Sequence, residues 1–280
     1  WLKQCIQSAL AQKAPNVEVQ IEVVDDGSSD ESIELIEQLA KEHSFLWRTQ
    51  QNRGLVATLE EQISRCDADY FAYQSTDDYW APEKLALQID WMEHHPRVPV
   101  LFTQALSVDA EGRPLPNSSQ LFLKPTSEMI GFEEIFLRKV GLCGASALIR
   151  RTSLPSSPIF PPEIIAEDLY LWLNITHRIG PVGILRQPLT YYRVHRSNLH
   201  HNTAPLANDI LSILENYSSH PQYDRAKQSW SGSFFSQLAL TSPPDAFRFW
   251  INHPSLTSDT FKGLLKLFIP HGVWRRWKPL

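Results

Sequence analysis

Short strand-like segments alternate with helix-like segments through the first hundred residues of the chain. Residues 19–24 and 98–106 are rich in β-branched and apolar side chains, a composition that favours strands. Between them, apolar residues recur at helical spacing, as at Leu55, Leu59 and Ile63. Because parallel strands need crossover connections that are usually helical, this alternation predicts an α/β fold with a mostly parallel sheet flanked by helices.

Two of the predicted strands end in a pair of aspartates. Asp25 and Asp26 follow the first strand, and Asp77 and Asp78 follow a strand-like run at 69–74. In open α/β sheets, ligands gather at the carboxyl ends of strands. Adjacent carboxylates repel each other unless a cation or a donor-rich ligand compensates them, and Mg²⁺ or Mn²⁺ prefers such oxygen ligands. The alternative is that some of these side chains only cap helices or shape turns.

Composition narrows the classes of function. The chain has 26 basic and 31 acidic side chains, a net charge of −5, which disfavours nucleic-acid binding through phosphate contacts. Its three cysteines are far apart, so neither a disulfide framework nor a cysteine-rich zinc site is supported. The glycine-rich motifs of dinucleotide folds and of P-loops are absent from the sequence. The negative charge of a phosphate-containing ligand would therefore have to be compensated by a bound cation and by hydrogen-bond donors from separate parts of the chain.

Four motifs in chain order resemble the family 2 glycosyltransferases, which are inverting enzymes of the GT-A fold. These are residues 23–30 (VVDDGSSD), 52–55 (NRGL), 76–85 (TDDYWAPEKL) and the pair Glu167–Asp168. The resemblance implies a Rossmann-like GT-A glycosyltransferase domain over residues 1–200 that lacks the family's first strand. A helical C-terminal extension over residues 201–280 follows, and we expect the sequence to be a fragment.

The resemblance also implies roles for five aspartates. Asp26 would accept a hydrogen bond from the nucleobase, with Asp25 beside it, and Asp77 would contact the ribose. Asp78 would hold a divalent metal on the diphosphate. Asp168 would be the general base that takes the proton of the acceptor hydroxyl. The alternative for Asp168 is a charge that complements the dipole at a helix start.

Four further residues complete the predicted site. Residues 191–198 are similar to a segment that, in some family members, returns a histidine or arginine to the diphosphate. By this resemblance Arg193 would contact the diphosphate and His195 would ligate the metal, since guanidinium groups clamp phosphate and imidazoles bind Mn²⁺. The alternative there is a solvated surface pair. Glu167 and Trp80 are predicted on the acceptor side, Trp80 as a ring on which a sugar could stack.

The predicted reaction moves a sugar from a nucleotide-diphosphate donor, a UDP- or dTDP-sugar, to a hydroxyl of a glycan or lipid-linked acceptor. We expect Mg²⁺ or Mn²⁺ as cofactor, no nucleic-acid partner and a place in cell-surface polysaccharide biosynthesis. One alternative is a non-catalytic nucleotide-sugar or glycan-binding module of the same fold. The other is a nucleotidyltransferase, which also uses an α/β sheet and a metal.

The end of the chain is basic and aromatic. Residues 259–280 carry five basic side chains and one acidic, and they include Trp274 and Trp277. Such a segment predicts peripheral contact with an anionic membrane surface by a cytoplasmic protein, at the inner face of the membrane. The alternative is that it packs back on the protein.

Overall fold

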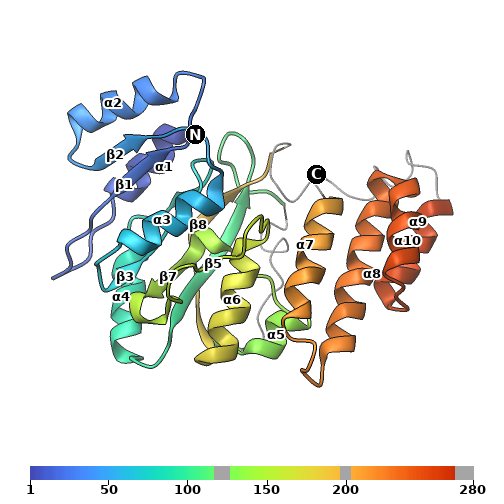
Figure 1. Cartoon of the computed structure of the whole chain (residues 1–280). Helices are drawn as coiled ribbons and strands as arrows, with labels where there is room; N and C mark the ends of the chain where they lie inside the picture. Colours follow the sequence, from blue (N-terminus) through green and yellow to red (C-terminus); the bar gives the residue numbers. More distant parts are fainter. Residues whose placement is uncertain (117–126, 196–202, 269–280) are drawn as a thin grey trace. The chain divides into compact units, whose positions relative to one another are not determined.

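The structure is a computed structural model that describes residues 1–116, 127–195 and 203–268 (Figure 1). The chain divides into two compact units, which are described separately below. The sheet unit comprises Trp1–Phe132, Val140–Glu163 and Leu171–His195. The helical unit comprises Glu133–Lys139, Ile164–Tyr170 and Arg196–Leu280. The domain boundary predicted at residue 200 stays a prediction.

The elements of the sheet unit are α1 (Leu2–Leu10), β1 (Glu22–Asp25), α2 (Ser32–Glu42), β2 (Leu46–Thr49), α3 (Leu55–Arg65), β3 (Tyr70–Phe71), β4 (Tyr79–Trp80), α4 (Lys84–His94), β5 (Val100–Val108), β6 (Met129–Ile130), the short 3₁₀ helices η2 (Gly144–Ser146) and η3 (Arg151–Ser153), β7 (Ala147–Arg150) and β8 (Val182–Arg193). Two helices have residues in both units, α5 (Phe132–Phe136) and α6 (Glu167–Arg178). The helical unit adds α7 (Thr203–Glu215), α8 (Tyr223–Thr241), α9 (Pro243–Asn252) and α10 (Ser258–Phe268).

Strands β1 and β2 form a parallel pair of their own. Helices α1 and α2 pack against this pair through an apolar cluster that includes Ile6, Ile36 and Leu39. The helical periodicity of the sequence places these residues on one face of each helix, so their burial follows from the pattern. The cluster fixes the carboxyl end of β1, where Asp25 lies.

The second sheet has the strand order β3-β7-β5-β8-β4, with β6 also paired to β8. Strands β5 and β8 run parallel, and the other pairs are antiparallel. The directions are therefore more mixed than the alternation of strands and helices predicts. Three of the antiparallel strands are only two residues long, too short for a hydrophobic pattern to reveal them.

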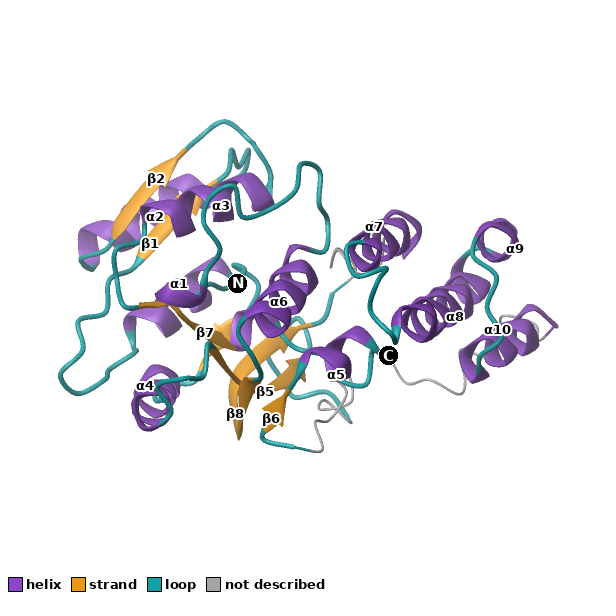
Figure 2. Ribbon diagram, turned by 60° about the horizontal axis from the view of Figure 1, so that its bottom comes forward, coloured by secondary structure: helices purple, strands orange, loops and turns teal. Residues whose placement is uncertain are grey.

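Helices cover both faces of this sheet (Figure 2). Consecutive residues of β5 point to opposite faces, because side chains alternate along a strand. Leu101 packs with Leu85 and Met92 of α4. On the other face, the ring of Phe102 meets the ring of Trp172 in α6 edge-on, with 4.9 Å between centroids. Strands β4 and β8 belong to this buried sheet, so its packing fixes the positions of their ends.

The helical unit is built around α8. Helices α9 and α10 both pack on it, and the ring of Phe235 lies 6.2 Å from that of Trp250 in α9. A Cβ atom at Gly263 of α10 would lie 2.6 Å from the Phe235 ring, so only glycine permits this approach. In the described residues, no helix is long and apolar enough to cross a membrane.

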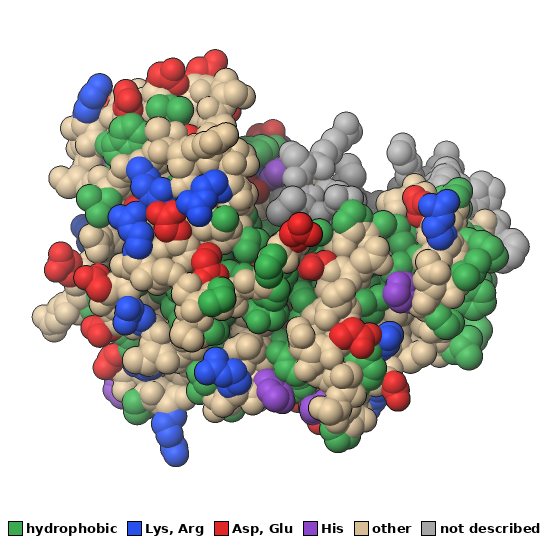
Figure 3. Space-filling model, in the orientation of Figure 1, with side chains coloured by type: hydrophobic (Ala, Val, Ile, Leu, Met, Phe, Trp, Pro, Cys, Tyr) green, Lys and Arg blue, Asp and Glu red, His purple; other side chains and the backbone are tan. Residues whose placement is uncertain are grey.

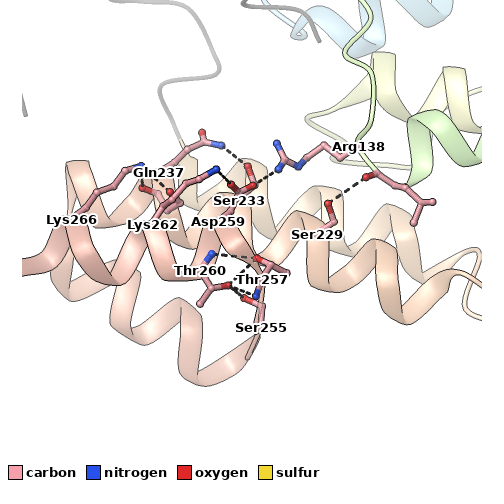
Figure 4. Close-up of polar contacts among 12 residues, drawn as sticks. Arg138, Ser229, Ser233, Gln237, Ser255, Thr257, Asp259, Thr260, Lys262 and Lys266 are labelled. Carbon is pink, nitrogen blue, oxygen red and sulfur yellow. Dashed lines mark hydrogen bonds and ion pairs between the residues drawn. The ribbon is translucent and has the colours of Figure 1, made fainter. Parts of the chain in front are cut away.

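The short segment Glu133–Lys139 is bound into the helical unit by side chains of its C-terminal helices. Trp230 donates its indole N–H to the carbonyl of Phe136 at 3.0 Å, and Arg138 forms an ion pair with Asp259 of α10. Figure 4 shows this ion pair together with Ser229, which donates to the carbonyl of Leu137. The C-terminal helices thus hold a piece of chain from far upstream.

Candidate functional site

Strand pairing joins two parts of the predicted site. Asp77 and Asp78 lie in the turn before β4, and β4 pairs antiparallel with β8, with Tyr79 opposite Tyr191. The pairing brings the two aspartates beside Arg193 and the residues that follow it, more than a hundred positions later in the chain. We call this group the β4–β8 junction: Asp77, Asp78, Arg193 and His195.

Asp77 and His195 contact each other directly. The Nε2 atom of His195 donates to Oδ2 of Asp77 at 2.8 Å, and both side chains are largely buried. The ring of Trp1 lies 4.7 Å from the imidazole, and its indole N–H donates to the carbonyl of Ala110. Sequence reasoning missed Trp1, because an aromatic residue before the first helix carries no pattern of its own.

Asp78 is almost fully buried, with 3% of its surface exposed. Its Oδ1 atom accepts the backbone N–H of Arg193 at 2.9 Å. Burial raises the pKa of Asp78 to about 7, even though this N–H favours the charged form; the negative charge of Asp77 adds to the rise. A positive charge bound beside the pair would oppose this rise.

Arg193 is buried and surrounded by protein oxygens. Its Nε atom donates to the carbonyl of Asp77 at 2.8 Å, Nη1 donates to the carbonyls of Asp109 and Ala110, and Nη2 donates to Oε1 of Gln4 at 2.6 Å. The guanidinium therefore fixes the backbone of Asp77 relative to α1 and to the turn after β5. Its predicted contact with a diphosphate stays a prediction.

Asp25 is held by the turn that follows β1. Its carboxylate accepts the backbone N–H groups of Gly27 and Ser28 and, at 2.8 Å, the hydroxyl of Thr49 on β2. Although burial opposes ionisation, these hydrogen bonds lower the pKa of Asp25. Gly27 has a φ of +82°, and a Cβ there would lie 2.9 Å from the backbone nitrogen of Asn52.

Asp26 binds the turn before α3. Its Oδ1 atom accepts from the Gln50 amide at 2.8 Å and from the N–H of Arg53, and Oδ2 accepts from the N–H of Gly54 at 2.7 Å. Partial burial alone would raise the pKa of Asp26, but these hydrogen bonds outweigh it and lower the pKa. The first acidic motif and the NRGL motif thus form one bonded unit. The predicted contacts of Asp25 and Asp26 with a nucleoside stay predictions.

Trp80 is buried beside the acidic turn. Its indole N–H donates to the carbonyl of Ala145 at 2.8 Å, and the ammonium of Lys84 lies 4.2 Å from its ring centroid. Burial lowers the pKa of Lys84 to about 7. In this structure Trp80 anchors the Gly144–Ser146 turn, and its predicted contact with an acceptor is untested.

Glu167 and Asp168 begin α6 and belong to the helical unit. Glu167 is buried, Asp168 is half-buried, and Oδ1 of Asp168 accepts the N–H of Leu169. Loss of water around them raises the pKa of both carboxyls, and the charges of Asp168 and Asp209 raise that of Glu167 further. A raised pKa moves a carboxyl toward the range in which it can accept and release a proton during catalysis.

The side chains of the β4–β8 junction could bind a divalent cation if the phosphates of a bound substrate supplied further oxygen ligands. Within residues 1–116, 127–195 and 203–268, no group of three or more histidine, cysteine or acidic side chains is arranged to bind a metal alone. Asp77 and Asp78 bring two carboxylates beside the His195 imidazole, and for His195 to bind a cation its hydrogen bond to Asp77 would have to break. Magnesium sites commonly use one or two carboxylates, with substrate phosphates completing the shell.

Residues 1–156 match the sequence profile of glycosyl transferase family 2. The chain belongs to this family. The matched region contains both acidic motifs and ends after β7, while the residues from β8 that join the acidic turn lie beyond it. The family predicted from the four motifs is thereby confirmed.

Relatives of this chain include proteins named as glycosyltransferases. The Escherichia coli protein WfaP, named a UDP-Glc:alpha-D-GlcNAc-diphosphoundecaprenol beta-1,3-glucosyltransferase, is 25% identical over 197 residues, 70% of this chain and 73% of WfaP. The Erwinia amylovora amylovoran biosynthesis glycosyltransferase AmsE is 26% identical over 69% of this chain and 70% of AmsE. An uncharacterized Mycobacterium tuberculosis protein is 24% identical over 72% of this chain, which spans only 57% of that protein.

Solved structures share the fold. S. aureus TarS 1–349, crystallised with UDP-GlcNAc, aligns with a TM-score of 0.67 and 17% identity over 90% of this chain and 75% of TarS 1–349. The Pyrobaculum calidifontis mannosyltransferase PcManGT, in complex with GDP-Man and Mn²⁺, aligns with a TM-score of 0.59 and 15% identity over 98% of this chain and 79% of PcManGT. The predicted GT-A type α/β fold with a C-terminal helical region is confirmed.

Proposed function

We propose that this protein is an inverting glycosyltransferase that moves a sugar from a nucleotide-diphosphate donor to a hydroxyl of a glycan or lipid-linked acceptor. The observation that carries the proposal is the β4–β8 junction, where Asp77, Asp78 and His195 meet in a family 2 chain. The GT-A fold and the polysaccharide enzymes among the relatives support a role in cell-surface polysaccharide biosynthesis.

On the donor side, Asp25 and Asp26 would face the nucleoside, and Asp77 the ribose. Asp78 and His195 would hold Mg²⁺ or Mn²⁺ on the diphosphate, and Arg193 would add positive charge there. The lowered pKa values of Asp25 and Asp26 support this division, because both stay ionised acceptors at neutral pH. The cation, when bound, would stabilise the negative charge that develops on the departing diphosphate.

The reaction is a direct displacement at the anomeric carbon. The acceptor oxygen forms a bond to this carbon while the bond from the carbon to the diphosphate breaks, so the configuration inverts. Asp168 takes the proton of the acceptor hydroxyl, and the nucleoside diphosphate leaves with the electron pair. Burial raises the pKa of Asp168, and this supports a base role because a carboxylate with a raised pKa accepts a proton more readily than an ordinary one. Glu167 and Trp80 would lie on the acceptor side.

The proposed donor is a UDP- or dTDP-sugar. A structural neighbour and a relative support this choice and a lipid-linked acceptor: TarS 1–349 was crystallised with UDP-GlcNAc, and WfaP is named for UDP-Glc and a diphosphoundecaprenol acceptor. For an acceptor in a lipid bilayer, the enzyme must work at a membrane surface. We therefore retain the prediction of a cytoplasmic protein in peripheral contact with the inner face of the membrane.

An exposed apolar surface on the helical unit supports this membrane contact. Figure 3 shows hydrophobic side chains gathered over the end of the unit where α9 and α10 lie. The exposed residues are Phe247 and Ile251 on α9, Leu256 in the connection, and Phe261 and Leu265 on α10. We call them the α9–α10 apolar surface, and Leu256 is 80% exposed. Exposed apolar groups clustered in this way mark interaction sites in soluble proteins.

Helix α10 turns several polar groups toward its own unit instead of toward water. Asp259 pairs with Arg138, Thr260 bonds the hydroxyl of Ser255, and Lys266 donates to Ser236 (Figure 4). The net charge of +4 over residues 259–280, part of which lies outside the described residues, complements anionic lipid headgroups. Apolar groups facing outward beside a basic segment suit a lipid surface.

Sedimentation with vesicles tests the membrane contact. We expect the protein to pellet with phosphatidylcholine vesicles that contain phosphatidylglycerol, and the double variant Phe261→Asp/Leu265→Asp to lose most of this binding. The control is Ile179→Asp, which changes an exposed apolar residue of the sheet unit. Membrane contact through this surface is wrong if the wild type stays in the supernatant or the double variant pellets as the wild type does.

Titration with UDP and Mn²⁺, together with hydrolysis of a panel of nucleotide sugars, tests the proposed activity. A glycosyltransferase should bind UDP and release it slowly from its cognate donor even without acceptor. Binding with neither hydrolysis nor transfer would support the non-catalytic module. Release of pyrophosphate from a nucleoside triphosphate would support the nucleotidyltransferase.

A further inference from the structure

A carboxylate of the C-terminal helices holds the backbone next to the proposed base. Oδ2 of Asp209, on α7, accepts the N–H of Ile165 at 3.0 Å and the N–H of Ala166 at 2.7 Å. Ala166 is the residue immediately before Glu167, where α6 begins. All of these groups belong to the helical unit.

These two hydrogen bonds are strong for their position. Backbone N–H groups at the start of a helix have no partner within the helix and need one from elsewhere. Here a charged oxygen from another helix accepts two successive N–H groups, and hydrogen bonds to charged acceptors are shorter and stronger than neutral ones. The Asp209 carboxylate therefore fixes where α6 begins, and with it the Cα positions of Glu167 and Asp168.

The same carboxylate acts on the carboxyl pair through its charge. The groups whose charges raise the pKa of Glu167 are Asp168, its neighbour on α6, and Asp209 from α7. Because Glu167 and Asp168 are adjacent and the charge of Asp168 raises the pKa of Glu167, a charge that acts on Glu167 bears on its neighbour as well. Asp209 thus acts on this pair by geometry and by charge.

We propose that Asp209 is a positioning residue for the catalytic base, holding the 165–166 backbone so that Asp168 is presented to the acceptor hydroxyl. The inference rests on the proposed function, because it takes Asp168 as the base. If it holds, the C-terminal helices contribute to the reaction, because α7 carries the residue that orders the backbone before Asp168. This contribution is separate from the proposed membrane contact of α9 and α10.

Two substitutions separate the geometric contribution from the electrostatic one. Asp209→Ala removes both hydrogen bonds and the charge, while Asp209→Asn keeps a side-chain oxygen that can accept the same N–H groups. The matched control is Glu215→Gln, which removes a charge from the same helix at a residue paired with Lys227. The measurements are kcat and KM for the donor across pH, UDP affinity by titration, and thermal unfolding to verify the fold.

We expect Asp209→Ala to lower kcat by about tenfold to a hundredfold, with donor KM and UDP affinity unchanged, because a small displacement of a reacting group is costly. Asp209→Asn should keep most of kcat and shift the acidic limb of the pH–rate profile to lower pH. Glu215→Gln should change neither.

Asp168→Asn, measured in parallel, tells apart two kinds of failure. If it retains full transfer, the base assignment and the role of Asp209 both fail. If Asp168→Asn is inactive while Asp209→Ala keeps the wild-type kcat and pH profile, only the inference about Asp209 is overturned. A fall in UDP affinity that matches the fall in kcat would also overturn it, because it would mark a general structural defect.

Discussion

Two pairs of adjacent carboxyl groups in this protein have opposite electrostatic surroundings. Asp25 and Asp26 accept hydrogen bonds from backbone and side-chain donors, and their pKa values are lowered. Glu167 and Asp168 have few donors and little water around them, and their pKa values are raised. The balance between burial and hydrogen-bond donors decides whether the pKa of each carboxyl lies below or above its ordinary value.

The difference matches the two halves of a transfer reaction. A donor-binding carboxylate must remain an acceptor throughout the cycle, whereas a general base must bind and release a proton in each turnover. Asp78 also has a raised pKa because it is buried, and a bound cation would lower that pKa again. Four predictions test this division, beginning with the largest effect.

Removing the proposed base should have the largest effect. Asp168→Asn keeps the size and hydrogen-bonding oxygen of the side chain but cannot accept the acceptor proton. We expect transfer to slow by about 10²- to 10⁴-fold while UDP affinity stays at its wild-type value. Transfer assays and calorimetric titration measure the two quantities. If this variant transferred sugar at the wild-type rate, Asp168 would not be the base, and the two carboxyl pairs would not divide the reaction between them.

Weakening the cation site should reduce donor binding. Asp78→Asn can still accept the N–H of Arg193, so the β4–β8 junction should persist without the carboxylate charge. We expect UDP affinity in the presence of Mn²⁺ to fall by about 10- to 100-fold, by analogy with the loss of other metal-site groups. Titrations with and without Mn²⁺ check this. Glu111→Gln, which removes an exposed carboxylate paired with Arg113, is the control. Equal UDP affinity of the wild type with and without Mn²⁺ would contradict the role of Asp78.

Changing the partner of the base should shift the pH dependence of the reaction. Since the pKa of the Glu167–Asp168 pair is raised, transfer should increase as pH rises through a value above the ordinary carboxyl range. Glu167→Gln removes the carboxyl that competes for the proton, so the acidic limb of the kcat profile should move to lower pH. Glu163→Gln, at an exposed carboxyl, is the control. An unchanged acidic limb in Glu167→Gln would argue against the coupling.

The pair with lowered pKa values should contribute to stability, and this is the smallest of the four effects. Asp25→Ala leaves the N–H groups of Gly27 and Ser28 without their acceptor, so we expect the free energy of unfolding to fall by about 1–3 kcal/mol. Because the folded-state pKa of Asp25 is lowered, its contribution is fully present above its unfolded-state pKa of about 3.9 and is lost as pH falls through the lower folded value.

Denaturant unfolding at neutral pH and at about pH 3 measures this contribution. The difference between the wild type and Asp25→Ala should shrink at the lower pH. A difference that stays constant between the two pH values would mean that the charge of Asp25 does not contribute to stability.

The sequence was sufficient to predict the helices α1 to α4 and α6, the longer strands and Asp25 at the end of β1. It predicted two or three helical segments after Thr203 where the structure has α7 to α10, and it placed Asp77 and Asp78 at the end of a strand over residues 69–74, whereas they lie in the turn before β4. Each helix of the sheet unit has an apolar stripe, and β1 and β5 are rich in apolar side chains. The motif order predicted the family. The directions of β3, β4 and β6 could not be predicted, since a two-residue strand carries no periodicity.

The details of the candidate site depend on contacts that no local pattern encodes. Arg193 was predicted to contact the diphosphate, because its segment resembles one that does so in family members and a guanidinium can clamp phosphate. In the structure it is buried among carbonyl oxygens from distant segments. The hydrogen bond between His195 and Asp77 requires β8 to pair with β4. The contacts of Asp209 with Ile165 and Ala166 likewise require packing of the C-terminal helices, which sequence spacing does not reveal.

The central claim is that this protein transfers a sugar from a nucleotide-diphosphate donor held by a divalent cation. The most direct measurement is transfer from a labelled UDP- or dTDP-sugar panel to lipid-linked diphosphate sugars, by the full-length protein with Mn²⁺, with chelator, and with Mn²⁺ restored. We predict transfer that chelation abolishes and Mn²⁺ restores. Undiminished transfer in chelator would contradict the role of the cation, and UDP binding without transfer or hydrolysis of any donor would contradict the proposed enzyme.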